Sequence, residues 1–83
     1  MVVQVLLFGG MARMAGTSRV EVDLGCSQTP SVSRVLEALG EQHAALQGAL
    51  DTARLAVNSK FASDGDTVSA SDELVVIALV GGG

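Results

Sequence analysis

Two apolar segments near the ends of the 83-residue chain place the strongest constraint on its fold. They span residues 2–8 (VVQVLLF) and 74–80 (LVVIALV), and both are rich in β-branched side chains. Near-continuous apolar runs of this kind are typical of strands that are buried on both faces and that pair in parallel. The sequence therefore predicts that the first and last strands lie side by side in the centre of a sheet.

Two other segments show the strict alternation of half-exposed strands. They are residues 19–24 (RVEVDL) and 54–58 (RLAVN). In the first of them, Val20, Val22 and Leu24 are expected to face the core. The Asp-Gly-Asp sequence at 64–66 predicts a tight turn. We expect these two strands to lie beside the central pair.

One amphipathic helix is predicted between the two pairs of strands. Its apolar stripe follows the i, i+3, i+4, i+7 rule and consists of Val32, Val35, Leu36 and Leu39. Residues 29–31 (Thr-Pro-Ser) supply capping candidates and a proline that suits a first turn. Gly40 is expected to end this helix.

Shorter helical pieces are expected on either side of this segment. The first is a link at residues 11–15, after Gly9 and Gly10 end the first strand. The second lies within residues 41–50, and its inward side chains are predicted to be Ala45, Leu46 and Ala49.

These elements together predict an α+β architecture. A parallel pair of strands needs a crossover connection, and the main helix provides it. The result is a mixed sheet with parallel central N- and C-terminal strands and one main helix packed on one face, which is the ubiquitin-like β-grasp. We expect one domain at residues 1–80 and a flexible glycine tail at 81–83.

Composition excludes several classes of protein. The formal net charge is −4, the basic residues are not clustered, and there is no Trp or Tyr, which argues against nucleic-acid binding. The apolar run at 74–80 is too short to span a bilayer, and the N-terminus lacks the features of a signal peptide. A single cysteine excludes an internal disulfide framework and suits a cytoplasmic location.

The C-terminal sequence Gly81-Gly82-Gly83 is the strongest candidate for chemistry. Glycine has no Cβ, so such a tail can enter a cleft that any side chain would block. Its one reactive group is the terminal carboxylate of Gly83, which becomes an acyl donor once a partner enzyme activates it with ATP. The alternative is an idle terminus, since chain ends are commonly mobile and rich in glycine.

Side-chain candidates are weaker. His43 has no second histidine with which to build a metal site. Cys26 has no basic neighbour in sequence to lower its pKa. Acids at 64, 66, 72 and 73 lack the pattern of a calcium loop and are expected to be turn residues. We predict no metal site and no bound cofactor. A partner surface is predicted around the tail exit, formed by Phe61, Leu79 and Val80, with burial of Phe61 in the core as the alternative.

The chain resembles the MoaD-like family of sulfur carriers, the small subunits of molybdopterin synthase. The similarity covers most of the chain. The segments that carry it are residues 6–16 (LLFGGMARMAG), 31–36, 55–58 (LAVN), 72–77 (DELVVI) and the Gly82-Gly83 end.

The resemblance implies a β-grasp protein with a C-terminal thiocarboxylate. Gly83 would be adenylated by a ubiquitin-activating-type enzyme that uses ATP, and a sulfur donor system would then convert it to the thiocarboxylate. The tail would enter the large molybdopterin synthase subunit within a heterotetramer and donate sulfur to the pterin precursor. The catalytic lysines belong to that subunit, so the chain alone would be non-catalytic.

The sequence departs from the family at three places. Ala78-Leu79 stands where a Pro-Pro pair is common, Ser71 where a glycine is usual, and Gly81 where Ser or Thr is common. The alternatives are a carrier for thiazole synthesis, tRNA thiolation or cysteine synthesis, a modifier joined to lysines through Gly83, and a β-grasp interaction module with an idle tail.

Overall fold

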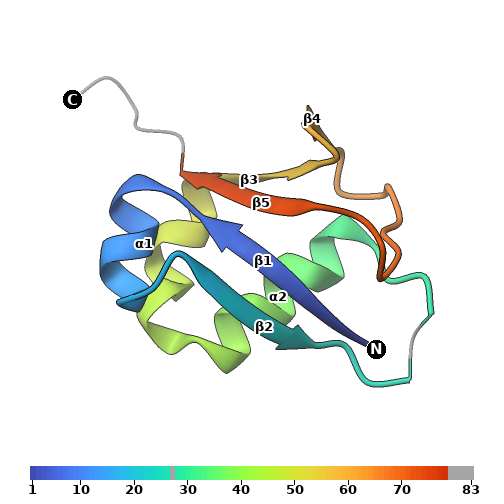
Figure 1. Ribbon diagram of the computed structural model, residues 1–83, viewed down its shortest axis with the longest axis horizontal. Coiled ribbons are helices and arrows are strands. Elements are labelled where there is room, and N and C mark those ends of the chain that lie inside the picture. Colours follow the sequence, from blue (N-terminus) through green and yellow to red (C-terminus); the bar gives the residue numbers. More distant parts are fainter. Residues whose placement is uncertain (27, 79–83) are drawn as a thin grey trace.

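The computed structural model describes residues 1–26 and 28–78 (Figure 1). Its five strands are β1 (Val2–Leu7), β2 (Arg19–Asp23), β3 (Ala53–Val57), β4 (Lys60–Phe61) and β5 (Leu74–Ala78). Its helices are α1 (Gly9–Ala15), α2 (Val32–Gln42) and the 3₁₀ helix η1 (Ala44–Thr52). The strands form one mixed sheet in the order β2-β1-β5-β3-β4, which confirms the predicted β-grasp arrangement.

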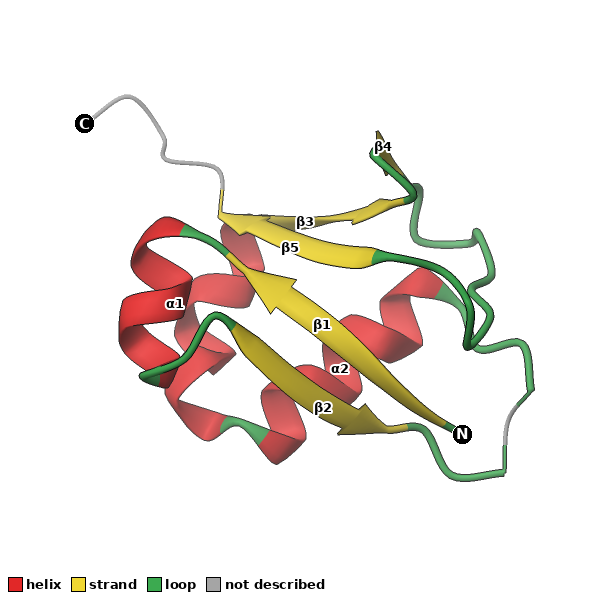
Figure 2. Ribbon diagram, in the orientation of Figure 1, coloured by secondary structure: helices red, strands yellow, loops and turns green. Residues whose placement is uncertain are grey.

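The central pair of the sheet is β1 and β5, as the two apolar segments predict. They are parallel, with Val5 opposite Leu74 and Leu7 opposite Val76. β1 pairs with β2, and β3 with β5 and β4, all antiparallel. The connection between the parallel strands passes through α2, which lies behind the sheet in Figure 2.

The expectation that both faces of the central strands are buried is wrong for β1, whereas it holds for Leu74, Val75 and Val76 of β5. Val5 and Leu7 are fully buried, whereas Val2 on the other face of β1 is 52% exposed. The reason is that the described helices cover one face of the sheet and leave the opposite face open (Figure 2). Below, we call this opposite side the open face.

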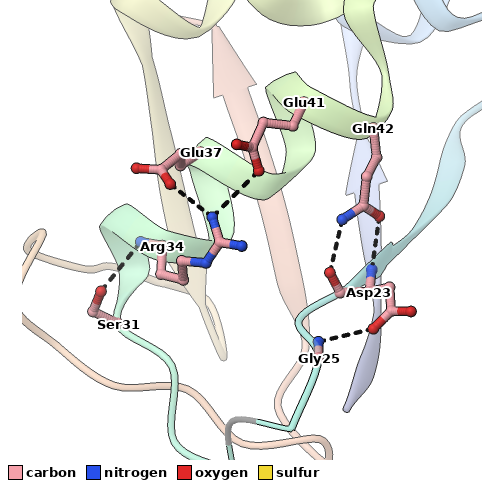
Figure 3. Close-up of polar contacts among 7 residues, drawn as sticks. All are labelled: Asp23, Gly25, Ser31, Arg34, Glu37, Glu41 and Gln42. Atoms are coloured by element: carbon pink, nitrogen blue, oxygen red, sulfur yellow. Dashed lines mark hydrogen bonds and ion pairs between the residues drawn. The ribbon is translucent and has the colours of Figure 1, made fainter.

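Helix α2 supplies much of the core against the covered face. Val32, Val35, Ala38 and Leu39 are buried, and Leu36 is half-buried. Ser31 is the N-cap, because its side chain accepts a hydrogen bond of 3.1 Å from the backbone N–H of Arg34 (Figure 3). The exposed face of α2 carries Arg34, which pairs with Glu37 and Glu41.

Gly40 does not end α2, contrary to the sequence prediction. The helix continues to Gln42, and Gly40 is buried within it. A Cβ at this position would lie 3.1 Å from Cδ1 of Leu50. The glycine therefore allows η1 to pack closely against α2, which is a packing role and not a capping role.

Two details of the other helices also differ from expectation. In η1, Leu46 is buried and Ala49 half-buried, but Ala45 is exposed. A 3₁₀ helix has three residues per turn, so the inward positions differ from those of an α-helix. Helix α1 begins at Gly9 and includes both glycines that were expected to precede it.

The β3–β4 hairpin is joined to the start of β5 through Asn58. Asn58 and Ser59 have positive φ angles of 52° and 72°, as the tight two-residue turn requires. The Asn58 side chain donates to Asp72 at 3.0 Å and accepts from the backbone N–H of Glu73 at 3.0 Å. These two hydrogen bonds hold the hairpin turn to the residues that precede β5.

Strand β2 is an edge of the sheet, and side chains occupy its outer backbone groups. The Gln42 amide accepts from the backbone N–H of Asp23 at 2.8 Å and donates to its carbonyl at 2.7 Å (Figure 3). Nε2 of His43 lies 2.9 Å from the carbonyl of Glu21, and the Thr17 hydroxyl donates to the carbonyl of Arg19. Side chains therefore occupy outer backbone groups of Arg19, Glu21 and Asp23 along this edge.

Candidate functional site

The open face carries an apolar surface patch, which we define as Leu6, Phe8, Ala56, Phe61, Val75 and Ile77. In the sheet register, Leu6 lies opposite Val75, Val75 opposite Ala56, and Ala56 opposite Phe61. Residues opposite one another in a sheet share a face, so these side chains form one row across four strands. The patch forms a shallow groove of about 370 Å³.

Two exposed aromatic rings belong to this patch. Phe8 is 60% exposed and Phe61 is 54% exposed. Large apolar side chains that cluster on a surface commonly mark the binding site for another protein. The open face is therefore the best candidate for an interaction surface in the described part of the chain.

A cation lies beside the apolar patch. The Arg54 guanidinium is 4.9 Å from the centre of the Phe61 ring, within the range of a cation–π interaction. Arg54 lies opposite Ile77 in the register of β3 and β5. The backbone of Arg54 is therefore near the end of β5, whereas its charged group lies over Phe61, which is opposite Ala56.

The opposite end of the open face carries charges of both signs, because Arg19, opposite Leu6, lines a groove together with Asp72 and Glu73. Glu73 precedes β5 and borders the groove, and Asp72 lies next to it. The backbone N–H of Ser69 and then the amide of Asn58 donate hydrogen bonds to Asp72, and these hold the pKa of its carboxyl below the usual value. Asp72 is therefore ionised at neutral pH.

The patch is continuous with the C-terminal segment of the chain. β5 runs through the middle of the open face and ends at Ala78, which pairs with Ala53. Gly81, Gly82 and Gly83, with Leu79 and Val80, follow this strand and lie outside the described residues. Their predicted roles stay predictions.

Phe61 is the one predicted site residue that the structure describes. It lies on the open face and not in the core. The sequence prediction missed Phe8, Ile77 and Arg54 as its neighbours. Phe8 and Ile77 could have been found, because they follow Leu6 and Val75 by two residues and so share their face. The contact between Arg54 and Phe61 depends on a hairpin register that the sequence pattern does not specify.

The contacts of the other candidate residues do not point to a catalytic or metal-binding role. His43 is half-buried and bonded to the β2 edge, and Cys26 is exposed. Asp66 accepts from the backbone N–H of Ser63 at 2.9 Å, which is the turn role expected for it. Among residues 1–26 and 28–78, no group of His, Cys, Asp and Glu has the geometry of a metal site. No helix in these same segments is both long and apolar enough to cross a membrane.

Comparison with known protein families gives a match over nearly the whole chain. Residues 5–83 match the ThiS family, and the match includes the terminal glycines. The chain belongs to the ThiS family. A search of the curated proteins found no match.

Solved structures place the protein among small β-grasp proteins. SAMP1 from Haloferax volcanii is 31% identical, with a TM-score of 0.79 and full coverage of both chains. A putative molybdopterin converting factor subunit 1 from Pyrococcus furiosus is 20% identical, with a TM-score of 0.79 and coverage of 96% of this chain and 99% of that one. A chain from the complex of molybdopterin-converting factor subunits 1 and 2 of Helicobacter pylori is 18% identical, with a TM-score of 0.65 and full coverage of both chains. The ThiS family membership and these neighbours bear out the resemblance to MoaD-like carriers.

Proposed function

We propose that this ThiS family protein is a sulfur carrier of molybdenum cofactor biosynthesis that works through Gly83. The observation that carries the proposal is the family match, which extends through the C-terminal glycine. Supporting it, β5 leads from an exposed apolar face directly into a segment that ends in three glycines. A partner can hold the folded domain by that face while the slim tail reaches into an active site.

The proposed chemistry has two steps at the terminal carboxylate. The carboxylate oxygen of Gly83 attacks the α-phosphate of ATP on an adenylating partner, and pyrophosphate leaves. A sulfide-equivalent nucleophile from a sulfur donor system then attacks the acyl carbon, a C–S bond forms, and the C–O bond to AMP breaks. The resulting thiocarboxylate would donate its sulfur to a pterin precursor in the large synthase subunit.

The large synthase subunit is proposed as the site of sulfur transfer because of structural similarity to two solved structures. The Pyrococcus protein is described as a molybdopterin converting factor subunit 1, and the Helicobacter structure holds subunits 1 and 2 together. The large subunit is therefore the proposed partner of this chain in the second stage. The adenylating enzyme would be its partner in the first stage.

A protein-modifier role is the second candidate, and one observation favours it. A Haloferax volcanii structure 28% identical to this chain over 95% of its length is named a small archaeal modifier protein. In a modifier, Gly83 is activated in the same way. The nucleophile that displaces AMP is then a lysine amine of a target protein and not a sulfur nucleophile. Both functions therefore share the adenylation step and differ in the nucleophile.

The adenylation and sulfur-transfer steps can be tested with purified proteins. The chain is mixed with the adenylating enzyme from the same genome, ATP and sulfide, and its intact mass is measured. We expect the mass change of an oxygen-to-sulfur exchange at Gly83, and none for the chain that lacks Gly83. If the adenylating enzyme is shown to be active on another carrier and the mass of this chain still does not change, the carrier proposal is refuted.

The acceptor is tested in a second experiment. The thiocarboxylated chain is added to the large subunit and the pterin precursor, and dithiolene formation is followed. Sulfur transfer supports the molybdenum route, and its failure with a competent large subunit points to another acceptor. Lysine-linked adducts found by mass spectrometry in cells would favour the modifier role.

A further inference from the structure

We infer that Lys60 is the acceptor amine for the activated Gly83 of a second copy of this chain, so that an isopeptide bond links the two copies. The inference rests on the proposed adenylation of Gly83, because a carboxylate that is not activated does not acylate an amine. It adds a modification site to the proposed function and names the molecule that carries this site.

The supply of amines in the chain is very small. Of the five basic side chains, one is Lys60 and the remaining four are arginines. Arginine stays protonated in proteins, so its guanidinium does not act as a nucleophile toward an acyl group. The amine of Met1 donates a hydrogen bond to the carbonyl of Gly25 and is already engaged. A lysine-linked product between two copies must therefore form at Lys60.

The Lys60 side chain is accessible to a second molecule. Lys60 is exposed and belongs to β4, the strand at one edge of the sheet. Within residues 1–26 and 28–78, the ion pairs are those of Arg34, and none involves Lys60. No carboxylate in these segments therefore has to be displaced before the amine can react.

Lys60 is not part of the apolar patch on the open face. It lies opposite Val57, and Val57 lies opposite Leu74, which is fully buried against the helices. Residues opposite one another in a sheet share a face. Lys60 therefore belongs to the covered side of the sheet, at its free edge.

A groove of about 410 Å³ borders the acceptor amine. Its lining residues are Val57, Lys60, Phe61, Ala62, Asp66 and Thr67. Because β4 is an edge strand, an extended segment can bind to its outer backbone groups. The sequence Gly81-Gly82-Gly83 suits this place, since it has no side chains to clash with the walls of the groove.

The position of Lys60 favours a second copy over the same chain. Lys60 is level with Leu74 at the start of β5, whereas the chain leaves this strand at Ala78 (Figure 1). Four residue steps and two strand spacings separate the backbones of Lys60 and Ala78 by about 16 Å. Residues 79–83 span at most about 18 Å. Attachment within one chain would require this segment to turn back along the sheet with most of its length extended, which costs conformational entropy.

The proposed step is an acyl transfer that balances without a further reactant. The neutral amine of Lys60 attacks the acyl carbon of the adenylated Gly83 of the second copy, and a C–N bond forms. The C–O bond to the phosphate breaks, AMP leaves with the electron pair, and the amine releases a proton to water. The linked pair has the mass of two chains less one water.

The test uses the adenylating enzyme from the same genome, ATP and an excess of this chain, without sulfide. ATP–pyrophosphate exchange reports adenylation, and intact mass with peptide sequencing reports the linkage. Hydroxylamine treatment first removes any thioester formed at Cys26. We expect a linked pair whose branch point is Lys60.

Two variants test the site. Lys60→Arg should lower the linked product at least tenfold and leave ATP–pyrophosphate exchange unchanged. Combining Lys60→Arg with Arg34→Lys moves the single lysine to the exposed face of α2, away from the groove, and should give less than a tenth of the wild-type product. Thermal melts establish that the variants are folded, and Lys60→Gln replaces Lys60→Arg if that variant unfolds.

The outcomes separate this inference from the proposed function. Absence of exchange with the wild type contradicts the proposed function itself. Exchange without a linked pair contradicts only the inference about Lys60. A branch at Met1, a single chain that has lost one water, or full product from the relocated lysine would also overturn the inference.

Discussion

Asn58 shows how a single residue can organise the loop side of the sheet. Its backbone forms the β3–β4 turn in the left-handed region, while its side chain joins Asp72 and Glu73. Asparagine suits both tasks, because it tolerates positive φ and offers a donor and an acceptor on one short side chain. The start of β5 is therefore held to the hairpin before the strand crosses the sheet.

Asp72 gives a prediction about pH. Its lowered pKa means that the folded state favours the carboxylate, so its stabilisation is present above the unfolded pKa of about 3.9 and is lost as pH falls through the folded value. We expect Asp72→Asn to lower the melting temperature at pH 7. The difference from wild type should become smaller at pH 3, and a difference that does not depend on pH would contradict the assignment.

Ser59 gives a prediction about backbone strain. Its φ of 72° is disfavoured for a residue with a side chain, and this turn type prefers glycine at its second position. We expect Ser59→Gly to raise the free energy of unfolding by about 0.5–1 kcal/mol, after allowance for the flexibility of glycine in the unfolded chain. Urea denaturation would measure it, and a destabilised variant would show that the strain argument fails.

At the scale of elements, periodicity predicted the strands better than it predicted the helix ends. The apolar segments gave the two central strands, and the spacing of Val32, Val35 and Leu39 gave α2. The predicted end of α2 was wrong, because glycine is favoured both as a helix cap and where two helices pack closely. Contact between Gly40 and Leu50 depends on tertiary structure, which local sequence does not reveal.

The start of α2 gives a prediction that separates its capping candidates. Ser31 accepts the hydrogen bond from Arg34, whereas Thr29 is exposed and precedes the cap. We expect Ser31→Ala to cost about 1 kcal/mol of unfolding free energy. Thr29→Ala should be nearly neutral in the same denaturation experiment. Equal effects would mean that the cap is not the cause.

At the scale of the molecule, the candidate site could be predicted in part. The sequence left Phe61 either exposed or in the core, and the structure shows it exposed, whereas the predicted role of the glycine tail stays a prediction. A helix on one face of the sheet was predicted, but the exposure of Val2 on the other face of β1 was missed, since apolar runs are typical of strands buried on both faces. Phe8 and Arg54 gain their significance only when β1, β3 and β5 are assembled.

The whole-molecule prediction separates stability from function. A chain that lacks Gly83 should melt within about 2 °C of wild type, because a terminal glycine has no side chain to bury and a change below about 0.2 kcal/mol moves Tm by no more than this in a domain of this size. The same chain should form no adenylate in the exchange assay. A large loss of melting temperature would instead give the glycine a structural role.

The side chains that bind the β2 edge affect how copies of the chain can associate through their sheets. Endless stacking of copies through their sheets requires two open edges on each copy, one to receive and one to offer a strand. Gln42, His43 and Thr17 remove one of the two. A strand added at the β3–β4 side would therefore find fewer free backbone groups at β2, which disfavours growth beyond a pair of molecules.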